Sequence, residues 1–136
     1  MKCLLTIVLL FVFNCSIAQM LGDTRSAILE LESTAPCEIR ANKLLFCYKE
    51  KNMISYSFNS KNYCGSITKL TSVSKSEAEL LLAKKLSLYS TKPHVSGNRH
   101  TFFFSDSHMI SYSIVNQEEF GVFFEETEIN TDILKR

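Results

Sequence analysis

The chain has 136 residues, 46% of them hydrophobic and 21% charged, which excludes a disordered, collagenous or wholly coiled-coil protein. Fifteen Lys and Arg against fourteen Asp and Glu give a net charge of +1, so no basic excess indicates a nucleic-acid partner. The length suits one domain or two small repeats rather than a multidomain enzyme.

Residues 1–18 have the layout of a secretory signal peptide. Lys2 supplies the positive start, and an apolar run follows at 4–13. Small residues at 16 and 18 then predict cleavage before Gln19. A transmembrane helix needs about 20 apolar residues, twice the length of this run. We therefore expect a secreted or periplasmic protein without a transmembrane segment after cleavage.

Lipid attachment at Cys15 is the alternative fate of this N-terminus, and it would make the protein a lipid-anchored envelope scaffold. Asn14 argues against it, because lipoprotein signals resemble one another in carrying a small residue at that position. Removing 18 residues from 136 leaves 118, with fourteen basic and fourteen acidic side chains and three cysteines. An odd number of cysteines in an oxidising compartment allows one disulfide and one free thiol, or three buried thiols.

The first half of the mature chain predicts a helix followed by three strands. Thr24 or Asp23 is a suitable N-cap, and apolar residues recur on one helix face at Ala27, Ile28 and Leu31. Strands are expected at about 43–50, 53–59 and 63–70, with a hairpin turn at 51–52.

The second half repeats this order after a longer linker. Ser74 and Glu77 fit a capping box, and an apolar stripe follows at Ala78, Leu81, Leu82 and Leu86. A linker is expected at 90–98, then strands at about 99–106, 109–116 and 119–127, with a turn at 107–108.

An internal repeat connects the two halves. Met53–Ser57 (MISYS) recurs as Met109–Ser113, 56 residues later, and at this offset residues 44–68 show seven identities in 25 positions. Unrelated sequences would give about one or two. The sequence therefore predicts a single α+β domain of two tandem α-β-β-β repeats, 22–70 and 74–127, with helices on one face of an antiparallel sheet.

Strand alternation, with two-residue turns, assigns side chains to the two faces of this sheet. The helix-packed face is expected to carry Leu45, Cys47, Ile54, Tyr56, Phe58, Tyr63, Ile67, Thr101, Phe103, Ile110, Tyr112, Ile114 and Phe123. The opposite face mixes serines and Cys64 with large apolar residues. Its predicted partner-binding residues are Phe46, Tyr48, Met53, Phe102, Phe104, Met109 and Phe120.

Two interpretations of that opposite face stay open. Another part of the chain covers it, in which case its aromatics are core, or it is uncovered and docks a protein partner. The second interpretation predicts an exported, inhibitor-like binding module without catalysis.

The segment Gly22–Leu29 (GDTRSAIL) resembles the helix start of the SmpA/OmlA-type outer-membrane assembly lipoproteins and of the repeats in the β-lactamase inhibitor protein family. That resemblance implies tandem helix-plus-antiparallel-sheet units and a concave sheet that binds a protein. The second helix has Ser74-Lys75 in place of the glycine-led start, and the chain has no Trp. No functional residue carries over from the resemblance.

Motifs for phosphate, dinucleotide or zinc-protease chemistry are absent from the sequence, so no cofactor or metal is expected. The alternative to a binding module is a small hydrolase or thiol enzyme that uses His100, Asp106 and a cysteine. Cys47 and Cys64 align with phenylalanines in the second half, which favours apolar packing over catalysis. If a disulfide forms, Cys37–Cys64 is the expected pair.

Overall fold

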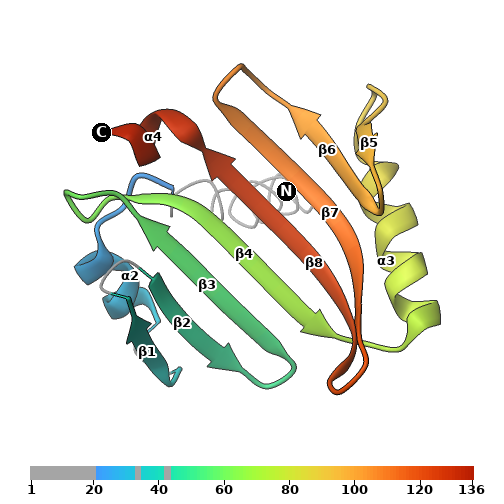
Figure 1. Ribbon diagram of the computed structural model, residues 1–136, viewed down its shortest axis with the longest axis horizontal. Helices are drawn as coiled ribbons and strands as arrows, with labels where there is room; N and C mark the ends of the chain where they lie inside the picture. The colour runs from blue at the N-terminus through green and yellow to red at the C-terminus, as the bar shows by residue number, and fades with distance from the viewer. Residues whose placement is uncertain (1–20, 33–34, 42–43) are drawn as a thin grey trace, which may run out of the picture.

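The computed structural model describes residues 21–32, 35–41 and 44–136, so the predicted signal peptide lies outside the described residues. Within these ranges the strands form one eight-stranded antiparallel sheet, and three helices accompany it (Figure 1). The strands are β1 Cys37–Arg40, β2 Leu44–Lys49, β3 Asn52–Phe58, β4 Cys64–Ser72, β5 His94–Ser96, β6 Arg99–Phe103, β7 His108–Gln117 and β8 Gly121–Asn130. The helices are α2 Arg25–Leu31, α3 Lys75–Leu86 and α4 Thr131–Lys135. No helix among the described residues is long and apolar enough to span a membrane.

The predicted α+β architecture with an antiparallel sheet is confirmed, but the strand count is corrected. The spatial order is β1-β2-β3-β4-β8-β7-β6-β5, so β4 and β8 pair at the centre and the shortest strands form the two edges. Four strands follow each of α2 and α3 instead of the expected three. The additional strand β5 lies just after Pro93 in the predicted linker 90–98, and β1 lies just after Pro36, before the first strand that was expected at about 43–50. Short strands next to proline are typical of sheet edges.

Both predicted helix starts are confirmed. The Thr24 side chain accepts a hydrogen bond from the backbone N–H of Ala27 at 3.3 Å, and it is the N-cap of α2. Ser74 and Glu77 form the complete capping box of α3, in which each side chain bonds the other residue's backbone N–H. Such caps satisfy backbone donors that have no partner inside the helix.

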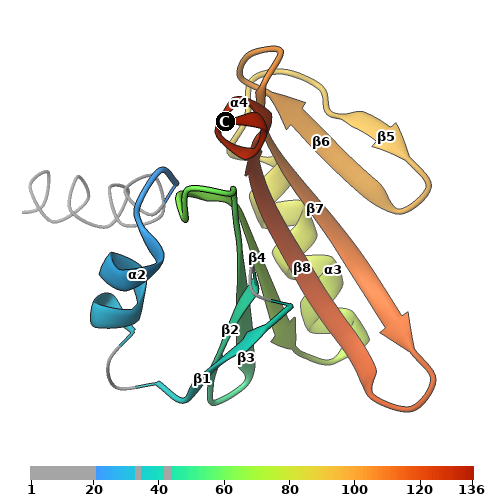
Figure 2. The same cartoon turned by 60° about the vertical axis from the view of Figure 1, so that its left-hand side comes forward.

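The face of the sheet on which α2 and α3 pack, here called the helix face, holds two apolar clusters. The cluster under α2 consists of Ile28, Leu45, Cys47, Tyr56, Phe58, Cys64 and Ile67. The cluster under α3 consists of Phe102, Ile110, Tyr112 and Phe124, with Leu81, Leu82 and Leu86 of the helix packed against it. Figure 2 shows α2 and α3 at separate places along the sheet. The expected burial of both MISYS tyrosines against the helices is confirmed.

The predicted faces are correct for β2 and β3 but reversed for β6 and β8. The first hairpin turn lies at 50–51, one position earlier than expected, and it keeps two residues, so the faces do not change. In the second half, Phe103 pairs with Met109 and Gln117 pairs with Gly121, which leaves an odd number of residues in each connection. The face assignment assumed two residues in each turn. An odd number of residues in a connection shifts the register by one and places every side chain of the neighbouring strand on the face opposite to the predicted one.

Phe102 is therefore a core residue and not a surface residue as predicted. It is 3% exposed, and its ring stacks on Tyr89 with the ring centroids 3.9 Å apart. Phe103 and Phe123, expected in the core, instead lie on the face opposite the helices. Phe124 takes the core position beside Tyr112.

The disulfide joins Cys37 to Cys47, so the expected Cys37–Cys64 pair is wrong. Because β1 pairs with β2, Cys37 lies directly opposite Cys47. Cys64 is a free, buried thiol. A register shift between Ser57 and Phe58 places it opposite Phe58 on the helix face, whereas uninterrupted alternation predicted the other face.

Candidate functional site

The face of the sheet opposite α2 and α3, here called the second face, separates its polar and apolar residues. Its middle holds small hydroxyl side chains, and Ser111, Ser113 and Thr127 are buried there. The hydroxyls of Thr68 and Thr127 are 3.1 Å apart, and Ser113 donates to the Glu125 carboxylate at 3.2 Å. Thr68, Thr127 and Ser113 therefore have hydrogen-bond partners, and the middle of the second face is polar.

Several large apolar side chains of the second face line a groove of about 400 Å³ at one end of the sheet. Tyr48 pairs with Met53 across β2 and β3, and Met53 pairs with Leu70 across β3 and β4. Phe123 of β8 lies opposite Ser72 of β4 and completes the wall. Directly opposed side chains in such pairs have Cβ atoms about 4.5–5.5 Å apart, so Tyr48, Met53 and Leu70 form a continuous apolar row, and Phe123 is the diagonal neighbour of Leu70.

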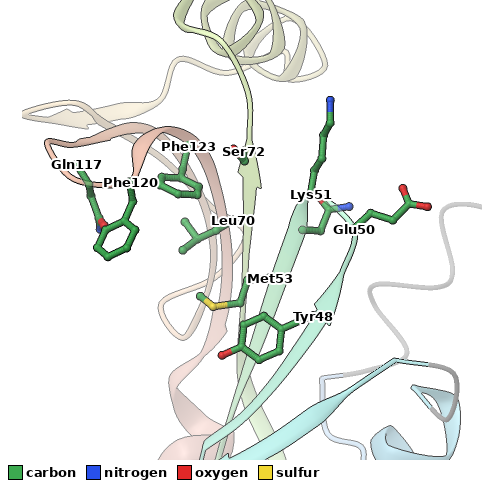
Figure 3. Close-up of a pocket in the computed structure, with 10 residues that line it drawn as sticks. Tyr48, Glu50, Lys51, Met53, Leu70, Ser72, Gln117, Phe120 and Phe123 are labelled. Carbon is green, nitrogen blue, oxygen red and sulfur yellow. The ribbon is translucent and has the colours of Figure 1, made fainter.

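Phe120 projects from the β7–β8 turn over the same groove and is 70% exposed. Figure 3 shows Phe120, Phe123, Leu70, Met53 and Tyr48 in succession along the groove. It also shows the charged ends of Glu50 and Lys51, in the opposite hairpin, pointing away from these rings. An aromatic side chain this exposed adds little to folding stability, so the turn presents it to solvent or to a ligand.

Tyr48 is held in place by an ion pair on the edge strand β1. Its hydroxyl donates to the Glu38 carboxylate at 2.9 Å, and Arg40 pairs with the same carboxylate. The hydrogen bond from Tyr48, together with Arg40, lowers the pKa of Glu38, and the carboxylate raises the pKa of the Tyr48 phenol. The Arg40 guanidinium also lies over the Phe46 ring at 4.9 Å. The β1 edge thus orients the tyrosine that forms one wall of the groove.

The structure brings together three of the seven predicted partner-binding residues: Tyr48, Met53 and Phe120 all line the groove. Phe46 and Met109 share the second face but lie in other rows of the sheet. Phe104 lies in the β6–β7 connection with its ring near His108, and Phe102 is in the core. Leu70 and Phe123 were missed: the β3–β4 pairing places Leu70 opposite Met53, and the β4–β8 pairing brings Phe123 to the same end of the sheet.

The residues of the alternative enzyme hypothesis lie apart. His100 is on the helix face, opposite Tyr112, and Asp106 follows six positions later in the exposed β6–β7 connection. Cys64 belongs to the cluster under α2, whereas His100 neighbours the cluster under α3. His108, which was expected in a turn, instead begins β7 and pairs with Glu128 at 2.7 Å. In the described part of the chain, no three His, Cys, Asp or Glu residues form a metal-binding group.

Burial raises the pKa of the Cys64 thiol to about 12. We expect it to react with a maleimide at pH 8 only when the protein unfolds, because the thiolate is the reactive form. A thiol that ionises near 9 in the unfolded chain and near 12 in the native state stays protonated in the native protein between these values. Its contribution to stability is therefore complete below pH 9 and declines as the pH rises towards 12.

Thiol labelling with and without denaturant measures this effect directly. The disulfide blocks Cys37 and Cys47, so among the described residues Cys64 is the single site that is labelled after unfolding without a reductant. Equally rapid labelling of the native protein would show that Cys64 is accessible and would contradict its burial.

No protein-family model, curated protein or solved structure matches this chain. The functional interpretation therefore depends on the geometry of the second face.

Proposed function

We propose that the protein is an exported binding module without catalysis, and that its groove takes an uncharged, extended segment of a partner protein. The observation that carries the proposal is the groove itself, with Tyr48, Met53, Leu70, Phe120 and Phe123 around one opening. Aromatic and methionine side chains are enriched at the centres of protein interfaces. Export is supported by the signal-like layout of residues 1–18.

The charges around the groove support an uncharged ligand. On the second face, Arg99 pairs with Glu125 at 2.9 Å, and Glu38 pairs with Arg40. Glu50 and Lys51, the charged residues that line the groove, have opposite signs and add no net charge to it. An aromatic or aliphatic side chain of the partner would replace water over the groove, and each fully buried side chain of this kind contributes about 1.5–3 kcal/mol.

We also propose that the two halves of the chain arose by duplication of one unit. A helix followed by four strands occurs twice along the chain, and the MISYS copies lie in β3 and β7. A duplication of this unit accounts for both facts. The groove then lies where the two halves meet, because β2, β3 and β4 come from one half and β8 and Phe120 come from the other.

Selection from a displayed library of short peptides tests the groove. We expect the selected peptides to be uncharged, with at least one aromatic or large aliphatic residue. Phe120→Ser should weaken their binding at least about tenfold, which corresponds to about 1.4 kcal/mol. Because Phe120 is 70% exposed, the melting temperature should stay close to that of the unsubstituted protein.

Leu80→Ser is the matched control, since Leu80 is a similarly exposed apolar residue on α3, away from the groove. It should leave peptide binding unchanged. Peptides that bind the Phe120→Ser and unsubstituted proteins equally well would exclude the groove as the binding site.

A further inference from the structure

The two edges of the sheet differ in their protection against pairing with another strand. β1 carries Glu38 and Arg40, and such charges are a common defence of an exposed edge. β5, His94–Ser96, has no carboxylate, lysine or arginine, and its central residue Val95 is 55% exposed. Figure 2 shows β5 at the margin of the molecule, with no drawn helix or strand beyond it.

The hydrogen-bond alternation determines which backbone groups of β5 are available. Phe104 donates its N–H to the carbonyl of His108 at 2.9 Å, so even-numbered residues of β6 face β7 and odd-numbered residues face β5. Thr101 and Arg99 therefore bond to their partners in β5, His94 and Ser96. The N–H and C=O of Val95 point in the opposite direction, towards the free edge. No strand among the described residues pairs with that side of β5.

Apolar side chains flank this edge on both faces of the sheet. Val95 projects on the helix face, because it lies opposite His100, which shares that face with Tyr112. Phe103 projects on the second face and is 58% exposed, with its ring edge-on to His94 at 6.4 Å. An added strand would bury part of both side chains while it pairs the two free backbone groups.

We propose that β5 pairs with β5 of a second copy of this chain, antiparallel about Val95. In this arrangement the N–H of each Val95 donates to the C=O of the other, so the free groups satisfy one another. A two-fold axis makes the contact self-complementary, as in most homodimers. A net charge of +1 and an edge strand without carboxylate, lysine or arginine give little repulsion between the copies.

The proposal also limits the size of the assembly and the strength of the contact. In the sheet that the described residues form, β5 is the one unprotected edge, so pairing stops at a dimer with a continuous sixteen-stranded sheet, twice the eight strands of one copy. A three-residue strand offers a small interface, so the dimer should be weak and in rapid exchange. This site is separate from the groove of the proposed function and does not depend on it.

Sedimentation velocity over a range of concentrations tests the dimer, with the chain expressed from its full sequence. The unsubstituted protein should shift from monomer to dimer as its concentration rises. Val95→Lys should raise the dimer dissociation constant at least about tenfold, because two lysines would meet at the axis. Ile39→Lys is the matched control, because Ile39 is a 51% exposed apolar residue on β1, the opposite edge.

Amide hydrogen exchange supplies a readout specific to the pairing. Exchange of the Val95 N–H should slow as the concentration rises, whereas the amides of His94 and Ser96, already bonded to β6, should change little. A monomer at every concentration, assemblies larger than a dimer, or equal effects of Val95→Lys and Ile39→Lys would each overturn the proposal. Association without protection of the Val95 amide would overturn it as well.

Discussion

Phe102→Ala should destabilise the protein by about 3–5 kcal/mol, whereas Phe103→Ala, one position away, should change stability by no more than about 0.5 kcal/mol. Phe102 is 3% exposed and stacks on Tyr89, so its removal leaves a cavity between β6 and α3. Phe103 is 58% exposed on the second face and fills no part of either cluster. Because small domains have a total stability of about 5–15 kcal/mol, the first loss is a large share.

Urea unfolding followed by circular dichroism measures both changes. Phe103→Ala is the control for Phe102→Ala, since both variants lose a phenylalanine side chain from the same strand. If Phe103→Ala were the more damaging change, the registers of β6 and β7 would be shifted by one residue. The helix face would then carry the odd-numbered residues of β6, as the sequence alone suggested.

The sequence was sufficient for the elements whose signals are local. Ser74 and Glu77 define the start of α3 by themselves, because a capping box needs only residues three positions apart. The alternation of MISYS correctly placed Tyr56 and Tyr112 against the helices. Both features depend on a few adjacent side chains and not on the rest of the fold.

The faces of β6 and β8 depended on the lengths of the connections, which side-chain patterns do not specify. Phe102, Phe103 and Phe104 are three consecutive aromatics, so hydrophobicity does not distinguish one face from the other. One residue more or less in the turn decides which ring is buried. The same difficulty applies to Cys64, whose placement on the helix face requires the register shift after Ser57.

The groove was partly predictable because some of its residues are near neighbours along the chain. Tyr48 and Met53 belong to one hairpin, so their pairing follows from the turn between them. Leu70 and Phe123 are brought together by the pairing of β4 with β8, which joins segments more than 50 residues apart. No local pattern indicates a contact of this kind, and Gln117, Phe120 and Phe123 line the groove because of it.

Reduction of the Cys37–Cys47 disulfide should lower the free energy of unfolding by about 3 kcal/mol. The bond closes a loop with a sequence separation of 10, and a closed loop of this size restricts the unfolded chain by about that amount. The disulfide also attaches β1, a four-residue edge strand whose neighbour in the described sheet is β2. Comparing urea midpoints of the oxidised and reduced protein measures the loss, and the double variant Cys37→Ala, Cys47→Ala should be insensitive to reductant.

The same reduction should weaken binding in the groove, because β1 carries the carboxylate that orients Tyr48. The Glu38 carboxylate accepts a hydrogen bond from the Tyr48 hydroxyl at 2.9 Å. Release of the edge strand would remove this carboxylate from Tyr48. Peptides selected on the oxidised protein should therefore bind the reduced protein more weakly at temperatures where both forms remain folded. Tyr48→Phe, which lacks the hydroxyl, separates the two contributions: reduction should have a smaller effect on its affinity. If the affinity of the unsubstituted protein did not change on reduction, β1 would contribute to stability without orienting the site.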